Sequence, residues 1–316
     1  MDILQPKNQL KLFGYSNYFD MFTDLIDKEK LPNCILFNGP KGLGKATFSY
    51  HIINYILSKN EENNYQRDKF SIDKKNSSYK LISANTHQNF FLIDNISTDK
   101  EIKIDQIRNL LKFTTKSSYS KNLKIVLIDN AEHLNLNSSN ALLKAIEEPE
   151  SNTIFFIVHN SSFKILDTIK SRCMEFKIFL TLNEKRDILV NLLNNYSNSQ
   201  LTQGMEKDLI FDTPGNLLKH YFILLDNKIN IEDKFSCILY FLEKYQNDKD
   251  FETLYFLSLF IEKFYIEKCL QNNKELNTIY FNKSKILNQI YFLNKYNLNT
   301  KNVLISIKDI LLNEQK

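Results

Sequence analysis

A glycine-rich segment, GPKGLGKA from Gly39 to Ala46, constrains this chain more than any other part of its sequence. It follows the apolar run CILFN and precedes a helical pattern of apolar residues, so the local order is strand, loop, helix. Average usage predicts about 22 glycines in a chain of this length. This chain has 6, and three of them are Gly39, Gly42 and Gly44. Glycines at this spacing let backbone N–H groups turn inward on phosphates. A plain strand-to-helix turn is the alternative interpretation.

The segment fits the phosphate-loop pattern G-x-x-x-x-G-K, in which Lys45 carries a positive charge to the outer phosphates. The next position normally holds a Ser or Thr that ligates magnesium, but here it is Ala46. Thr47 lies one residue later, about 100° further around the helix. We therefore expect no metal ligand at this point. The phosphate-loop site is therefore degenerate, and ATP is its candidate ligand.

A second acidic site follows another apolar run, LKIVLI, which ends at Ile128 and leads into Asp129. P-loop ATPases usually present an aspartate for the metal at the end of such a strand. Asn130 comes next, and its amide cannot act as a general base. Glu132 is set two residues further along. The alternative interpretation is that Asp129 caps the loop or the next helix.

Four apolar runs, over residues 34–38, 90–93, 123–128 and 153–158, predict strands of a parallel sheet covered on both faces. Helical patterns separate them, and the one over Ser139–Glu148 places Leu142, Leu143 and Ile146 on one face. The polar stretch Lys59–Lys80 is expected to be a surface excursion outside the core. Beyond Thr181 only helical patterns remain. The fold class is therefore α/β in the first half and all-α in the second.

Composition excludes several classes of protein. A net charge of +4 does not indicate a strongly basic DNA coat. The four cysteines lie too far apart for a paired zinc motif or a dense disulfide framework. No basic-then-apolar leader opens the sequence, and no apolar run reaches the length of a membrane span. We expect a cytoplasmic protein.

Two further motifs carry a specific resemblance: ALLKAIEEPE, from Ala141 to Glu150, and KILDTIKSRC, from Lys164 to Cys173. Together with the segments around these motifs, residues from about 11 to 219 resemble the bacterial clamp-loader subunits of the AAA+ class. The resemblance is to the delta prime subunits of DNA polymerase III in particular. The resemblance implies three domains: a RecA-like AAA+ domain over 1–180, a small helical lid over 181–226 and a helical collar over 227–316.

The resemblance also implies partners and a role in DNA replication. Such a subunit joins motor subunits (gamma or tau) and a delta subunit in a hetero-pentamer that loads the sliding clamp onto primed DNA. Contact with DNA would be mostly indirect, and none with a membrane is implied. In the SRC motif, here Ser171, Arg172 and Cys173, the arginine acts as a finger on the neighbouring subunit's ATP. An ordinary surface ion pair is the alternative interpretation of Arg172.

Departures from the motor pattern favour the stator, delta prime. AAA+ motors carry a glutamate where Asn130 stands and a sensor arginine where Gly215 stands. Residues 59–80 contain no cysteine, so the four-cysteine zinc module of many relatives is not expected. The chain is thus expected to be a subunit of the polymerase holoenzyme that does not hydrolyse ATP itself. A catalytically active, gamma- or tau-like clamp-loader ATPase is the alternative, and an unrelated P-loop kinase or helicase loader is a third.

Overall fold

The computed structural model describes residues 4–94, 101–115, 123–149, 152–195, 202–271, 276–296 and 298–314. The chain divides into two compact units, Met1–Asn216 and Leu217–Lys316. Within the described ranges, none of the helices combines the length and the apolar content that crossing a membrane requires.

The first unit is built on a five-stranded parallel sheet in the order β2-β3-β4-β1-β5. The strands are β1 (Cys34–Gly39), β2 (Phe90–Ile93), β3 (Lys124–Ile128), β4 (Thr153–Asn160) and β5 (Met174–Lys177). Four of them confirm the predicted runs. The sequence did not predict β5, because only four residues pair with the edge of β1 and none of them is buried.

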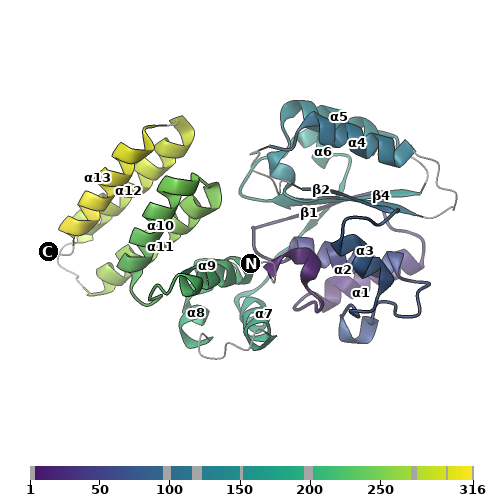
Figure 1. Ribbon diagram of the computed structural model, residues 1–316, viewed down its shortest axis with the longest axis horizontal. Coiled ribbons are helices and arrows are strands. Elements are labelled where there is room, and N and C mark those ends of the chain that lie inside the picture. Colours follow the sequence, from purple (N-terminus) through teal and green to yellow (C-terminus); the bar gives the residue numbers. More distant parts are fainter. Residues whose placement is uncertain are drawn as a thin grey trace. The chain divides into compact units, whose positions relative to one another are not determined.

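Helices cover both faces of this sheet, as Figure 1 shows. On one side lie α1 (Ser16–Asp27), α2 (Lys45–Leu57) and α3 (Ser77–Ser83), and on the other α4 (Ile104–Thr115), α5 (Leu136–Glu147) and α6 (Asp167–Lys170). The short 3-10 turns are η2 (Pro6–Asn8), η3 (Arg67–Lys69) and η4 (Ala131–His133). Helices α7 (Leu182–Asn195) and α8 (Thr202–Asp208) follow the sheet, and α9 (Pro214–Asp226) begins in this unit.

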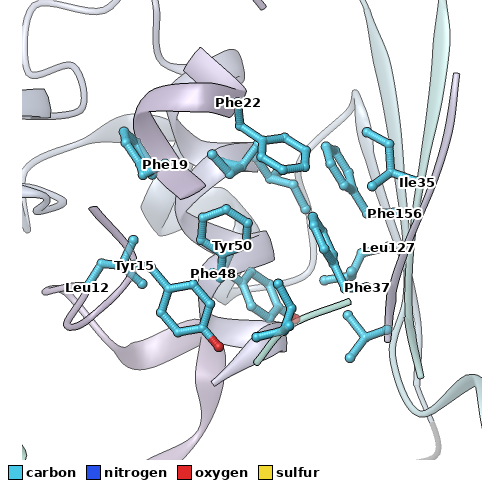
Figure 2. Close-up of a cluster of buried hydrophobic side chains, with 14 of the residues drawn as sticks. Leu12, Tyr15, Phe19, Phe22, Ile35, Phe37, Phe48, Tyr50, Leu127 and Phe156 are labelled. Atoms are coloured by element: carbon cyan, nitrogen blue, oxygen red, sulfur yellow. The ribbon is translucent and has the colours of Figure 1, made fainter. Parts of the chain in front are cut away.

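The apolar strands bury both of their faces because successive side chains point to opposite sides. In β1, Ile35 and Phe37 join the core beneath α1 and α2, where the rings of Phe22 and Phe48 pack against Phe37 (Figure 2). The alternate residues Cys34 and Leu36 face the core that α4 and α5 cover. This two-sided burial explains why the strands read as continuous apolar runs.

The helical phase of α5 differs slightly from the expected one. Leu142 is fully buried and Ile146 nearly so, but Leu143 is only partly buried. Ala145 shares the buried face instead. The expectation that Leu143 lies on the central buried face was therefore wrong by about one position. The reason is that the inner face also takes Ser138 and Ser139, which an apolar pattern does not register.

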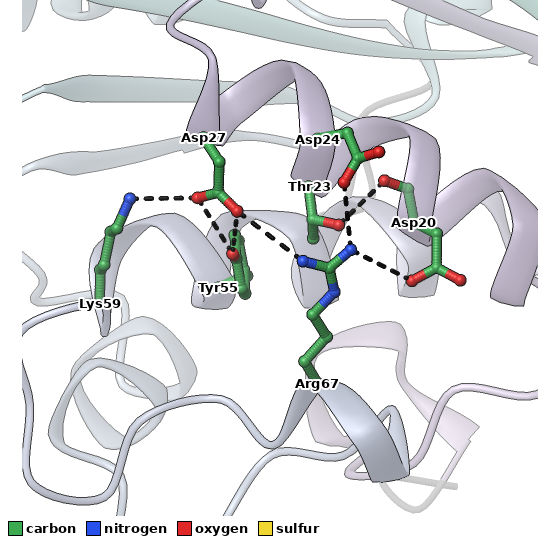
Figure 3. A network of polar contacts seen from close by, with 7 residues as sticks. All are labelled: Asp20, Thr23, Asp24, Asp27, Tyr55, Lys59 and Arg67. Carbon is green, nitrogen blue, oxygen red and sulfur yellow. Dashed lines mark hydrogen bonds and ion pairs between the residues drawn. The ribbon is translucent and has the colours of Figure 1, made fainter.

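The polar stretch 59–80 lies mostly at the surface but contributes buried side chains to the core, so the expectation that it lies outside the core is wrong for those residues. Tyr65 and Ile72 are buried with the residues under the sheet, and the ring of Tyr65 stacks on Phe19 at 4.9 Å between centroids. Arg67 holds the stretch against α1 (Figure 3). Its guanidinium lies 3.5 Å from Asp20, 3.2 Å from Asp24 and 3.8 Å from Asp27. These three carboxylates recur on one face of α1, and all of them pair with Arg67 while remaining partly exposed.

Among its described residues, the second unit contains most of α9 and a bundle of four further helices. They are α10 (Lys234–Asp248), α11 (Phe251–Gln271), α12 (Leu276–Tyr296) and α13 (Thr300–Asn313). Each packs on the next, and α13 closes on α10. The aromatic residues of α11 are mostly core, since Phe256, Phe260 and Tyr265 are buried within the bundle.

Candidate functional site

The phosphate-loop sequence forms a tight turn between the end of β1 and the start of α2. Gly42 and Gly44 have φ angles of +80° and +94°, a region that residues with a Cβ rarely adopt. Gly44 is the residue before α2, which begins at Lys45. Gly42 and Gly44 are therefore required by the backbone of this turn.

The side chain of Lys45 is folded into the loop. It is 5% exposed, and its ammonium donates to the carbonyl oxygens of Gly39 at 2.7 Å and Pro40 at 2.6 Å. Burial lowers the pKa of Lys45 to about 8, an effect that the charges of Glu132 and Asp129 oppose. A phosphate would have to compete with these carbonyls for the ammonium.

Acidic groups gather around Asp129, which follows β3 directly. Burial, followed by the charge of Asp94, raises the pKa of Asp129 to about 7. The Asn130 backbone N–H donates to Asp129 at 2.9 Å, and its side-chain amide donates to Asp94 at 2.8 Å. Glu132 accepts from the backbone N–H of Asn160 at 3.0 Å, so it is held by the end of β4.

This arrangement does not fit a magnesium ion. The side chain of Ala46 has no oxygen to offer a magnesium ion at the position after Lys45. Asn130, in the left-handed region with φ +55°, directs its amide to Asp94. The loop-capping interpretation of Asp129 is also consistent with its bond to Asn130.

The segment 213–216, which follows α8, donates hydrogen bonds to the carbonyl oxygens of the phosphate loop. The Thr213 hydroxyl donates to the Lys41 carbonyl at 2.8 Å, and the Gly215 backbone N–H donates to the Gly42 carbonyl at 2.9 Å. Asn216 donates to Lys41 at 3.4 Å and to Asp212 at 2.9 Å. A Cβ on Gly215 would lie 2.6 Å from the Gly42 oxygen. Sequence reasoning noted the missing arginine at Gly215, but not that the segment closes on the loop.

Sequence reasoning also missed a polar link between β1, β4 and β5. The His159 ring lies 3.1 Å from the Asn38 side-chain oxygen, and the Asn38 amide donates to Glu175 at 2.7 Å. Lys170 lies 3.3 Å from the same glutamate. Asn38 and His159 are polar residues at the ends of two apolar strands, and that position is the signal that could have found them.

The SRC motif lies at the corner between α6 and β5. Arg172 is exposed, and its guanidinium donates to the Thr168 carbonyl at 2.9 Å and pairs with Glu147 at 2.5 Å. Ser171 is exposed, and its hydroxyl also donates to Thr168, at 3.2 Å. Cys173 is partly buried against the core under α5. Two partners thus hold the guanidinium in one orientation at the surface.

The sheet separates this corner from the chain's own phosphate loop. All five strands are parallel, and Met174 of β5 pairs with Ile35 of β1. Arg172 therefore lies at the amino end of the sheet, whereas the loop leaves β1 at its carboxyl end after Gly39. Six residues of strand correspond to roughly 20 Å. The structure brings Gly42, Lys45 and Asp129 together and leaves Arg172 away from them.

The strand order, the phosphate loop after β1 and the aspartate after β3 define a P-loop domain of the AAA+ class. The model of a family described as "DNA polymerase III, delta subunit" matches residues 14–180, slightly more than half of the chain. The chain belongs to this family, and several of its relatives are delta prime subunits of the clamp loader.

Two such relatives give the scale of the similarity. The DNA polymerase III subunit delta' of Pseudomonas aeruginosa is 30% identical over 156 residues, which cover 49% of this chain and 45% of that protein. The delta' subunit of Buchnera aphidicola subsp. Schizaphis graminum is 29% identical over 209 residues, 62% of this chain and 61% of that protein. The matches thus span less than two thirds of these relatives.

A gamma subunit-related protein of Thermotoga maritima shares the fold. Its crystal structure aligns with a TM-score of 0.51 at 18% identity, over 92% of this chain and 97% of that one. A DNA polymerase III subunit gamma/tau of Mycoplasma genitalium is also similar in sequence, with 28% identity over 234 residues, 72% of this chain and 37% of that protein.

Proposed function

We propose that this chain is the delta prime stator of a clamp loader and supplies Arg172 in trans to the ATP of a neighbouring motor subunit. The observation that carries the proposal is the exposed guanidinium at the opposite end of the sheet from the chain's own phosphate loop. An arginine that far from its own loop cannot reach a nucleotide bound there, so a role in ATP hydrolysis requires the nucleotide of another subunit. The rest of the SRC motif, Ser171 and Cys173, forms the corner that presents it.

The chemistry of Arg172 follows from its planar cation. A guanidinium has five N–H donors and stays charged at any working pH, so it can neutralise charge that develops on a transferring phosphoryl group. Glu147 and Thr168 hold the group in a fixed orientation before a partner arrives. The neighbour then finds the cation already positioned, which lowers the entropic cost of the contact.

The chain's own phosphate site supports a structural role rather than hydrolysis. Lys45 is bonded to loop carbonyls, Ala46 cannot ligate a cation, and Asn130 cannot act as a base. Thr213 and Gly215 bond to the loop from the other side. We propose that the segment Gly39–Thr47 with Asp129 binds nucleotide weakly or not at all, that no metal or zinc is required, and that the closed loop stiffens the subunit.

The helical bundle supports assembly with partners. Tyr280, Phe281, Tyr291 and Tyr296 of α12 are all more than half exposed. Residues eleven apart lie on nearly the same face of a helix, so Tyr280 and Tyr291 form one line. Exposed aromatic lines of this kind are typical of protein interfaces. We propose that residues 227–316 form a collar that joins gamma or tau and delta subunits in a cytoplasmic hetero-pentamer, which loads a sliding clamp onto primed DNA in replication.

Two measurements test the proposal. Native mass spectrometry of the chain with gamma or tau and delta subunits of a related loader should give a five-subunit complex that contains one copy of this chain. The isolated chain, with ATP and magnesium, should show no turnover above the buffer blank.

Failure to join the complex would contradict the stator assignment. Magnesium-dependent turnover that is lost in Lys45→Ala would contradict it in a different way, because it would favour the motor-type ATPase. A Lys112→Ala variant is the matched control, since that lysine is exposed on α4, outside the phosphate-loop segment.

A further inference from the structure

Two cysteines far apart in the sequence meet beside the SRC motif. The sulfur atoms of Cys34 and Cys173 lie 2.8 Å apart, although 139 positions separate the residues. Both are free thiols. Cys34 is the first residue of β1, and Cys173 directly precedes β5.

The strand register explains why they meet. Ile35 pairs with Met174, so one step earlier Cys34 stands opposite Cys173. Adjacent parallel strands lie about 4.8 Å apart, which falls within the range of about 4.4 to 6.8 Å between Cα atoms that a disulfide requires. The two side chains also point to the same face of the sheet, since both contact the core under α5. Little backbone movement would be needed to join them.

The two thiols differ in access to solvent. Cys34 is 6% exposed, whereas Cys173 is only partly buried. The contact with Cys173, and then burial, raises the pKa of the Cys34 thiol. A small oxidant therefore reaches Cys173 first and leaves Cys34 as the thiol beside it. An accessible cysteine next to a resolving cysteine is the usual arrangement of a redox-sensitive pair.

We propose that Cys34 and Cys173 form a reversible disulfide when the protein meets a hydroperoxide. In the first step, the Cys173 sulfur attacks the peroxide, its thiol becomes a sulfenic acid, and one water leaves. In the second, the Cys34 sulfur attacks the sulfenic sulfur, the S–S bond forms, and the hydroxyl leaves as a second water with the Cys34 proton. Two thiols are thus oxidised as one hydrogen peroxide is reduced to two waters.

The bond would tether the corner that carries Arg172. Cys173 is the next residue after Arg172, and Cys34 is the first residue of β1, which lies between β4 and β5 in the sheet. Only an effect of this tether on the arginine finger rests on the proposed function. The disulfide itself can be tested on the isolated chain without any partner.

The test is thiol mapping by mass spectrometry. The full-length chain is treated with hydrogen peroxide, alkylated under denaturing conditions and digested. Two of the four thiols should be lost, a peptide with Cys34 should be linked to one with Cys173, and dithiothreitol should restore both. A Cys269→Ser variant, which changes a cysteine outside the pair, should give the same link.

A Cys34→Ser variant should lose the link and leave a sulfenic acid on Cys173 that a 1,3-diketone reagent traps. If this variant does not fold, the peptide map of the native chain decides alone. Four thiols that remain alkylated would overturn the proposal, as would a link through Cys237 or Cys269. A sulfinic acid on Cys173 beside an alkylated Cys34 would also overturn it.

Discussion

Replacing Asp129 by Asn should stabilise the protein above neutral pH. The pKa of Asp129 is raised from its ordinary value of 3.8 to about 7, chiefly by burial and by the charge of Asp94. At a pH well below 3.8 the carboxyl is protonated in both the folded and unfolded states, so it does not affect the free energy of unfolding. As pH rises to 7 the unfolded chain releases this proton before the folded chain does, and stability falls. Above pH 7 the folded state bears the full destabilisation from the ionised Asp129 carboxylate.

The magnitude follows from the same values. A tenfold change in proton affinity corresponds to about 1.4 kcal/mol, so a rise from 3.8 to about 7 sets an upper limit of about 4 kcal/mol. The carboxylate is partly exposed, and solvent screens part of this cost. We expect Asp129→Asn to raise the free energy of unfolding by about 1 to 3 kcal/mol at pH 8. The asparagine oxygen can still accept from the Asn130 N–H, so the local bond survives.

The assay is urea unfolding followed by circular dichroism at pH 4, 6 and 8, with the exposed Asp68→Asn as the matched control. The gain in the free energy of unfolding should grow from pH 4 to pH 8 in Asp129→Asn and stay near zero in the control. A variant that is less stable than the native chain at pH 8 would refute the reasoning, because it would mean that the charged carboxylate is favourably paired in the folded state.

Four further substitutions test the core, the ion pairs and the loop. Leu142→Ala should lower the free energy of unfolding by about 2 to 5 kcal/mol, and the partly buried Leu143→Ala by less; equal losses in urea titrations would show that the face of α5 is assigned wrongly. Arg67→Ala should cost about 1 kcal/mol in 0.05 M salt, because three partly exposed aspartates lose their cation; thermal unfolding in 1 M salt should shrink this loss, and a loss that does not depend on salt would contradict the electrostatic account. Gly42→Ala should destabilise by about 1 to 3 kcal/mol, since its Cβ would lie 2.2 Å from Thr213 at a φ of +80°; an unchanged denaturation midpoint would mean that the Thr213 segment does not close on the loop.

The sequence predicts the parts of this fold that depend on local pattern. Long apolar runs such as the one ending at Ile128 identify strands, and the glycines of the phosphate loop identify a turn that only they can form. Strand β5 was not predicted because it is short and because it pairs with β1, which is distant in the sequence. The stretch around Arg67 was misjudged because its partners lie on α1, more than forty residues earlier.

The candidate site divides in the same way. The motifs identify Lys45, Asp129 and Arg172, and the structure adds the burial and the hydrogen-bond partners of these side chains. The bond of Thr213 to Lys41 joins residues 172 positions apart, and the contact of Cys34 with Cys173 joins residues 139 apart. Contacts at that separation depend on how the strands and helices pack, which no local spacing encodes.

The most direct test of the central claim is ATP hydrolysis by a loader reconstituted from motor subunits, delta and this chain, with sliding clamp and primed DNA. The native chain is compared with Arg172→Ala and with Arg186→Ala, an arginine that pairs with Glu206 away from the SRC corner. Native mass spectrometry confirms that all complexes assemble. The trans arginine predicts that Arg172→Ala lowers turnover at least about tenfold and that Arg186→Ala leaves it unchanged. Unchanged turnover in an intact Arg172→Ala complex would contradict the claim.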